Sequence, residues 1–179
     1  MQRPQQGFNL VELMFTLVIM AILVGVALPS FDTMLDRRAV ESQANRLARS
    51  LNLARSKAVT GGNLVTVERL SGSSSDWSKG WRVYVDSSAG GSYNASSDDL
   101  ISTISIDTRD VSLINKAGAA DRVTFDARGQ QNGATPVKVE FSVCDKAKND
   151  KIDGSKVIVG TTGRVYLETI DATAKASKC

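Results

Sequence analysis

Residues 13–28 read LMFTLVIMAILVGVAL, and none of these sixteen side chains is charged. Extending the segment back to Phe8 adds only two polar residues, Asn9 and Glu12. As an α-helix, residues 8–28 would be roughly 30 Å long, which is about the thickness of a bilayer core. The segment therefore predicts a membrane-spanning helix at the start of the chain.

Two other interpretations of this apolar segment are weaker. A cleaved secretory signal would have a shorter apolar region and a cleavage site of small residues, and no such site occurs before Pro29. A buried core helix is disfavoured because helices that are apolar on every side are rare in a domain of this size.

Glu12 is the exception within this segment. A carboxylate inside a membrane costs on the order of 2.5–3.5 kcal/mol on insertion scales, so it needs a partner and suggests a function. The alternative is that Glu12 lies at headgroup depth, at a frayed helix start. The residue pattern alone leaves both interpretations open.

The segment after Pro29 predicts a second helical stretch over residues 31–60. Apolar residues recur there at spacings of four and three and form one stripe, which is typical of a helix packed on a core: Val40, Ala44, Leu47, Leu51, Ala54 and Ala58. The pair Gly61-Gly62 is a helix stop. Basic residues outnumber acidic ones in this stretch, which suits contact with lipid headgroups or DNA, but we interpret them as a solvated face opposite the core stripe. They are Arg37, Arg38, Arg46, Arg49, Arg55 and Lys57.

Residues 61–179 have the pattern of an antiparallel β-sheet with long loops. Short runs of β-branched and aromatic residues alternate with clusters of Gly, Ser, Asn and Asp. The predicted strands are residues 64–70, 81–85, 100–106, 122–125, 137–144, 157–159 and 164–167.

The composition excludes several classes of function. The 179-residue chain carries a net charge of only +3, and residues 61–179 are neutral, which argues against a dedicated nucleic-acid binder. The chain has no histidine, which removes histidine-based catalysis and histidine-ligated metal sites. No phosphate loop, dinucleotide fingerprint or nucleophile elbow occurs, so we predict neither an enzyme nor a cofactor nor a small-molecule substrate.

Two acidic loops have some of the oxygen-rich character of calcium sites. The first runs from Asp86 to Asp98 and Asp99, and the second spans residues 149–154. The second has Lys151 where a ligand belongs and no closing glutamate. We interpret both as solvated turns and predict no metal site.

The N-terminal residues resemble a known processing site. The sequence Gly7-Phe8-Asn9-Leu10-Val11-Glu12-Leu13 is similar to the motif G-F-x-L-x-E-L of type IV prepilins and pseudopilins, which also precedes an apolar helix. The resemblance implies that a prepilin peptidase cuts after Gly7, that the new amine of Phe8 is methylated, and that Glu12 guides assembly. It also implies that Pro29 bends the helix.

The head motifs resemble the GspH/FimT/FimU branch of this family. They are the segment at residues 76–86 (DWSKGWRVYVD) with Asp98-Asp99-Leu100, the segment at residues 123–129 (VTFDARG), and Gly163-Arg164-Val165. The implied α+β fold is a type IV pilin-like ladle, in which a long N-terminal helix packs on an antiparallel β-sheet head. Its expected parts are a leader (1–7), a transmembrane and assembly segment (8–29), an amphipathic helix (30–62) and a β-rich periplasmic head (63–179).

The chain has only two cysteines, Cys144 and Cys179. An even pair in an exported head suggests one disulfide, and a terminal disulfide resembles that of several minor pilins. Two unrelated thiols are the alternative.

The resemblance implies a structural protein rather than an enzyme. The leading expectation is a minor type IV pilin of the FimU type, which is anchored in the bacterial inner membrane by a single pass, joins other minor and major pilins, and primes pilus assembly near the tip. The alternative is the H-type pseudopilin of a type II secretion system. DNA capture, as in FimT-type members, is a third interpretation. It is disfavoured because Tyr166 stands where those members have a second arginine, in Gly163-Arg164-Val165-Tyr166.

Overall fold

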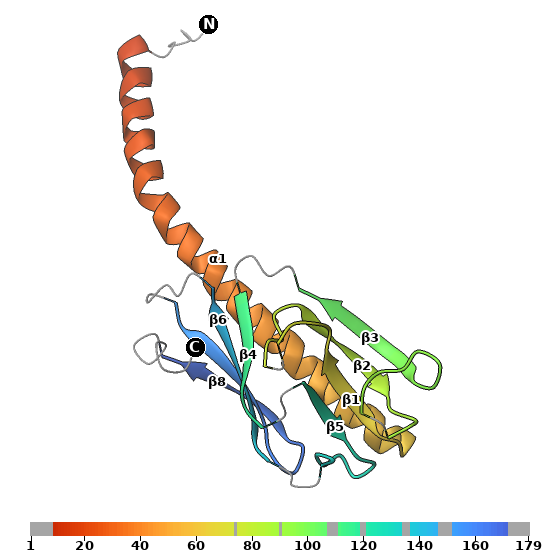
Figure 1. The fold of residues 1–179 in the computed structure, drawn as a ribbon. Coiled ribbons are helices and arrows are strands. Elements are labelled where there is room, and N and C mark those ends of the chain that lie inside the picture. Colours follow the sequence, from red (N-terminus) through yellow and green to blue (C-terminus); the bar gives the residue numbers. More distant parts are fainter. Residues whose placement is uncertain are drawn as a thin grey trace, which may run out of the picture. The chain divides into compact units, whose positions relative to one another are not determined.

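The computed structural model describes residues 9–73, 75–89, 91–106, 111–118, 121–133, 137–146 and 152–171, and for residues 26–32 it describes the backbone alone. The chain divides into two compact units, residues 1–35 and residues 36–179. Helix α1 (Leu10–Gly61) begins in the first unit and ends in the second. Figure 1 shows α1 and the strands of the second unit.

The start of α1 is capped by Asn9. The side-chain oxygen of Asn9 accepts a hydrogen bond from the backbone N–H of Val11, and its carbonyl oxygen accepts from the N–H groups of Glu12 and Leu13. These contacts satisfy donors that the first turn of a helix otherwise leaves unpaired. Within the described part of the chain, no helical segment combines the length and the apolarity needed to cross a bilayer.

The part of α1 in the second unit presents the predicted apolar stripe to the core. All six residues of the stripe are at most 1% exposed: Val40, Ala44, Leu47, Leu51, Ala54 and Ala58. The helix ends at Gly61, and Gly62 adopts a φ of 67°, which is unfavourable for residues with a side chain. The N–H of Gly62 donates to the carbonyl of Ala58. The predicted stripe and helix stop are therefore confirmed.

The head contains two antiparallel sheets, whereas the sequence pattern suggested one. The first has the order β3-β2-β1-β5, and the second has the order β4-β6-β7-β8. The strands of the first sheet are β1 (Val65–Arg69), β2 (Gly80–Val85), β3 (Asp99–Ser105) and β5 (Arg122–Phe125). Those of the second are β4 (Val111–Ala117), β6 (Val139–Asp145), β7 (Gly154–Val159) and β8 (Val165–Ile170).

Strand β4 was absent from the predicted strands. Its buried positions alternate as in an ordinary strand, at Val111, Leu113 and Asn115. The polar Asn115 occupies the third of these positions, which shortens the apolar alternation to two residues. β4 pairs with β6 in an antiparallel register, with Leu113 opposite Val143.

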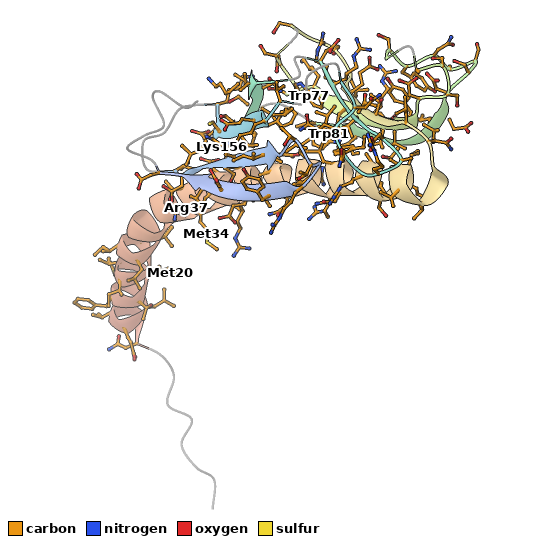
Figure 2. All side chains as sticks on the ribbon, turned by 90° about the horizontal axis from the view of Figure 1, so that it is seen from below. Met20, Met34, Arg37, Trp77, Trp81 and Lys156 are labelled. Carbon is orange, nitrogen blue, oxygen red and sulfur yellow. The ribbon has the colours of Figure 1, made fainter. Side chains whose placement is uncertain are left out.

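The core lies between the second part of α1 and both sheets. Leu47 and Leu51 of the helix share one buried cluster with Val83 of the first sheet and Phe141 of the second. Trp77 lies just before β2 of the first sheet and contacts the second sheet. Its backbone N–H donates to the carbonyl of Leu113, and its ring meets that of Phe141 edge-on, with centroids 4.8 Å apart. Figure 2 shows Trp77 and Trp81 among the strands of the head.

Candidate functional site

The first candidate site is the N-terminal part of α1. Gly7 and Phe8, the predicted cleavage and methylation positions, lie outside the described residues. Glu12 lies in the first turn of α1, is exposed, and is the only charged side chain among residues 9–25. Pro29 lies within α1, but its side chain and the predicted bend are outside what the structure describes.

The side chains around Glu12 form an apolar surface on all sides of the helix. The large apolar residues between Leu10 and Val24 are each 46–73% exposed. Met20, labelled in Figure 2, is one of these exposed side chains. Single exposed apolar residues are common on proteins, but a continuous surface of this kind marks contact with another protein or with lipid. Chemically, this segment offers dispersion contacts and a single carboxylate.

Cys144 is the described member of the predicted disulfide. It is 1% exposed, lies in β6 and is disulfide-bonded. Gly154 of β7 lies beside it, because a Cβ on Gly154 would be in van der Waals contact with the Cys144 sulfur, at 3.4 Å. Cys179 lies outside the described residues, so its pairing with Cys144 stays a prediction.

The first head motif folds into β2 and the turn before it. Gly80 opens β2 with a φ of 105°, and a Cβ at this position would lie 2.0 Å from the carbonyl oxygen of Ile104 on β3. Trp77 and Trp81, on either side of this turn, are fully buried. The motif is therefore a structural element that closes the core between β2 and β3.

The second and third head motifs meet at Arg55. The Nε of Arg55 donates to the carbonyl oxygen of Gly129 over 2.8 Å, and its Nη2 donates to the carbonyl oxygen of Thr162 over 3.5 Å. Gly163 adopts a φ of 78° and comes so close that a Cβ would lie 2.0 Å from the Gly129 carbonyl oxygen. One helix residue thus joins two loops that are far apart in sequence.

Sequence reasoning placed Arg55 on the solvated face of the helix, and the structure corrects this. Arg55 is half-buried, and its guanidinium satisfies loop carbonyls. No pattern within the helix distinguishes Arg55 from its basic neighbours, because its partners lie 74 and 107 residues away.

The acidic loop at residues 86–99 uses its carboxylates for internal hydrogen bonds. Asp98 is buried and accepts from the backbone N–H groups of Ser87 and Asn94. Asp86 is also buried and accepts from the N–H of Gly91. In the described ranges, no three Asp, Glu, Cys or His side chains gather in a way that would hold a metal ion. Residues 149–151 of the second acidic loop are outside those ranges.

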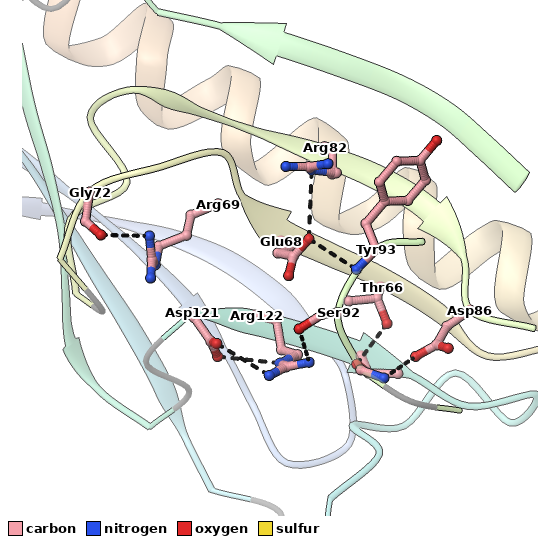
Figure 3. A network of polar contacts seen from close by, with 12 residues as sticks. Thr66, Glu68, Arg69, Gly72, Arg82, Asp86, Ser92, Tyr93, Asp121 and Arg122 are labelled. Carbon is pink, nitrogen blue, oxygen red and sulfur yellow. Dashed lines mark hydrogen bonds and ion pairs between the residues drawn. The ribbon is translucent and has the colours of Figure 1, made fainter. Parts of the chain in front are cut away.

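A polar network joins this loop to the outer side of the first sheet (Figure 3). Glu68 accepts from the N–H of Tyr93 and lies 3.6 Å from the Nε of Arg82, which in turn lies over the Tyr93 ring. Tyr84 donates its hydroxyl proton to the carbonyl of Gly91, and burial of this hydroxyl raises the pKa of Tyr84. The network positions the loop, and the raised pKa keeps the Tyr84 hydroxyl neutral.

The third head motif, Gly163-Arg164-Val165, bears on whether basic side chains of the head could bind DNA. Arg164 and Tyr166 are exposed at the start of β8. Nearby on the same sheet, Lys138 and Lys156 both form ion pairs with Glu140, at 2.6 Å and 3.2 Å. The hydrogen bond from Lys138 is the main cause that lowers the pKa of Glu140. These two lysines therefore already share a carboxylate, which weakens any attraction for phosphates.

Comparison with known proteins bears on the N-terminal segment and on the head. A sequence model of the family described as "Type II transport protein GspH" matches residues 43–163, which is more than half of the chain. A second model, described as "Prokaryotic N-terminal methylation motif", matches residues 2–28 and so includes Gly7, Phe8 and Glu12. No curated protein sequence matches the chain significantly.

Solved structures show the same head fold. The type IV minor pilin FimU of Pseudomonas aeruginosa is 28% identical with a TM-score of 0.57, over 72% of this chain and 91% of that chain. A second crystal form of FimU gives 24% identity and a TM-score of 0.59, over 75% and 92%. The minor pseudopilin EpsH of the Vibrio cholerae Type 2 Secretion System is 13% identical with a TM-score of 0.53, over 72% and 95%, and this likeness concerns the fold alone.

Proposed function

The chain belongs to the GspH family of pilin-like proteins, and on this premise we propose that it is a minor type IV pilin that primes pilus assembly near the filament tip. The family consists of structural proteins, so the proposed activity is assembly with other pilins rather than catalysis. The observation that carries the proposal is the N-terminal part of α1, where a continuous apolar surface contains a single carboxylate, Glu12.

The membrane and the filament would cover this surface in turn. We propose that residues 8–29 anchor the precursor in the bacterial inner membrane as a single pass, with residues 63–179 as a periplasmic head. Residues 30–62 connect the two, and Pro29 bends the helix between them. In the filament, helices of neighbouring subunits would replace lipid around the same side chains, at little cost because both environments are apolar.

Processing would create the partner that Glu12 needs. Cleavage by a prepilin peptidase between Gly7 and Phe8 removes residues 1–7 and leaves a methylated ammonium on Phe8. This ammonium on one subunit would pair with Glu12 of its neighbour. An unpaired carboxylate in an apolar environment is costly, so the pair fixes the register between subunits.

We also propose that Cys144 pairs with Cys179. The bond would close a loop of about 35 residues and stabilise the head by roughly 3–4 kcal/mol in the loop-entropy estimate. The buried position of Cys144 supports this role, because a disulfide there ties the C-terminal tail to the middle of the second sheet.

The choice of the pilus over a secretion system rests on the comparison with FimU. The chain is 28% identical to this minor pilin over 72% of its length, whereas its identity to the pseudopilin EpsH is 13%. The matching family model, whose description refers to type II transport, favours the second candidate, a minor pseudopilin H. We do not propose DNA capture, since Lys138 and Lys156 are engaged by Glu140.

Deletion of the gene in the source bacterium distinguishes the two candidates. The pilus proposal predicts that surface pili become scarce while the secreted enzymes appear in the medium at normal levels. Loss of enzyme secretion with normal piliation would overturn it in favour of the pseudopilin. Complementation with the intact chain controls for effects on neighbouring genes.

A further inference from the structure

A groove of about 370 Å³ runs between the second part of α1 and strand β3 of the head. It is lined by Arg46, Arg49, Ser50 and Leu53 of the helix and by Ser102 and Ile104 of the strand. The helix residues are spaced three and four apart, so they share one face. The two strand residues are two apart, so they share one side of the sheet. Two regular elements therefore form the walls.

The helix wall of this groove carries two arginines that the head leaves unpaired. Arg46 and Arg49 are exposed, and neither forms an ion pair or hydrogen bond with any described residue. By contrast, the guanidinium of Arg55, about two turns further along the helix, already donates hydrogen bonds to loop carbonyls. Two neighbouring guanidiniums on one face attract carboxylates and bind them in a directional way.

The other residues that line the groove are suited to binding a peptide. Leu53 is 39% exposed and Ile104 is half-buried, which offers an aliphatic contact. The Oγ of Ser102 is buried and has no hydrogen-bond partner in the described chain. Among the described strands β3 pairs only with β2, so it is an edge strand and the backbone on its other side has no described strand to pair with. Edge strands of this kind accept an added segment.

We propose that this groove receives an acidic segment of a neighbouring pilin-like subunit. An aliphatic side chain of that segment packs on Leu53 and Ile104, its carboxylates bind Arg46 and Arg49, and a polar group hydrogen-bonds to Ser102. The inference rests on the proposed function, because assembly is what brings a neighbour to the head. The groove offers the aliphatic side chains of Leu53 and Ile104, and two cations line it. Both features favour a protein segment over a phosphate-rich surface, which needs many cationic contacts.

Site-specific photo-crosslinking of the full chain in the bacterium tests this inference. A photoreactive amino acid replaces Leu53 in the groove, Asn52 as a control, or Val18 in the N-terminal part of α1. Asn52 is exposed and lies about 100° around the same helix. The Leu53 position is expected to give an adduct that mass spectrometry identifies as another pilin-like subunit, through a peptide containing Asp or Glu, whereas Asn52 gives at most a minor one.

Charge reversal tests the role of the arginines. Arg46→Glu with Arg49→Glu should lower the Leu53 adduct by about tenfold. Arg164→Glu, a single charge reversal just before β8 of the second sheet, should leave it unchanged. An Asp or Glu to Arg change at the crosslinked partner segment should restore the adduct to the doubly reversed chain.

The outcomes separate the two proposals. Val18 adducts with other pilins but no Leu53 adduct would overturn the groove and leave the proposed function standing. Absence of pilin adducts at Val18 as well would overturn the proposed function and the groove together. A Leu53 adduct with lipid or DNA, or one that is insensitive to charge reversal, would also overturn the groove.

Discussion

The Nε of Arg55 donates a hydrogen bond to the carbonyl oxygen of Gly129 over 2.8 Å, and so connects helix α1 to the loop that follows β5. The same guanidinium reaches the Thr162 carbonyl in the turn between β7 and β8. Because β5 and β7 belong to different sheets, this single side chain connects both sheets to the helix.

Arg55→Ala should lower the free energy of unfolding by about 1.5–3 kcal/mol, the usual contribution of a hydrogen bond to a charged group. Urea unfolding of the detergent-solubilised chain measures this. Arg38→Ala, at an exposed helix position without a described partner, should change the stability by no more than ~0.5 kcal/mol. Equal effects of the two changes would contradict the assigned role of Arg55.

Gly163→Ala should destabilise the head more than an ordinary loop substitution. The residue has a φ of 78°, and the added Cβ would lie 2.0 Å from the Gly129 carbonyl oxygen. Backbone strain of this kind costs about 1–3 kcal/mol, and the clash adds to it. Gly133→Ala is the matched control, since no atom lies within 4 Å of its Cβ position, and it should be neutral or slightly stabilising in thermal unfolding.

The predicted disulfide has a direct chemical test. The mass of the exported chain should be about 2 Da below that of the reduced form, and thiol reagents should find no free cysteine until the protein is reduced. Cys144→Ala and Cys179→Ala should each cost roughly 3–4 kcal/mol, and the double variant should cost little more than either. Two reactive thiols in the exported head would rule out the bond.

The ion pairs of Glu140 predict a pH dependence. Lys138 and then Lys156 hold the pKa of Glu140 below its usual value, so the folded state binds this proton more weakly than the unfolded state. The contribution to stability is present above the unfolded pKa of about 4.3 and is lost as the pH falls through the lower, folded pKa. Glu140→Gln should flatten the fall in stability below about pH 4.5, whereas Glu41→Gln, at an exposed helix position, should not. A decline of equal slope in both variants would contradict this.

The sequence allowed the helix to be predicted well because its signals are local. The stripe from Val40 to Ala58 and the stop at Gly62 depend only on residues close in the chain, and seven of the strands were found from alternation and turn residues. β4 was missed because Asn115 occupies a buried position, which only the pairing with β6 explains. The division into two sheets was missed for the same reason, since it depends on contacts between distant segments.

For the candidate sites too, local patterns could be recognised in the sequence and contacts between distant segments could not. Glu12 was recognisable because a single carboxylate interrupts an apolar run, which is a local pattern. Arg55 and the groove beside Arg46 were not, because their meaning depends on which loops and strands fold against the helix. The proposed partner of Glu12 belongs to a neighbouring subunit, so one chain cannot display it.

The central claim is tested most directly by comparing the amounts of the wild-type protein and of the Glu12→Ala variant in sheared surface pili. Quantitative mass spectrometry should find the wild-type protein in pili, with an N-terminal peptide that begins at methylated Phe8. Glu12→Ala should lower that amount by at least about tenfold, because the register pair is lost in an apolar environment, while Glu41→Ala should leave it unchanged. Normal incorporation of the Glu12→Ala variant would contradict the assembly role of Glu12, and absence of the wild-type protein from pili would contradict the proposed function itself.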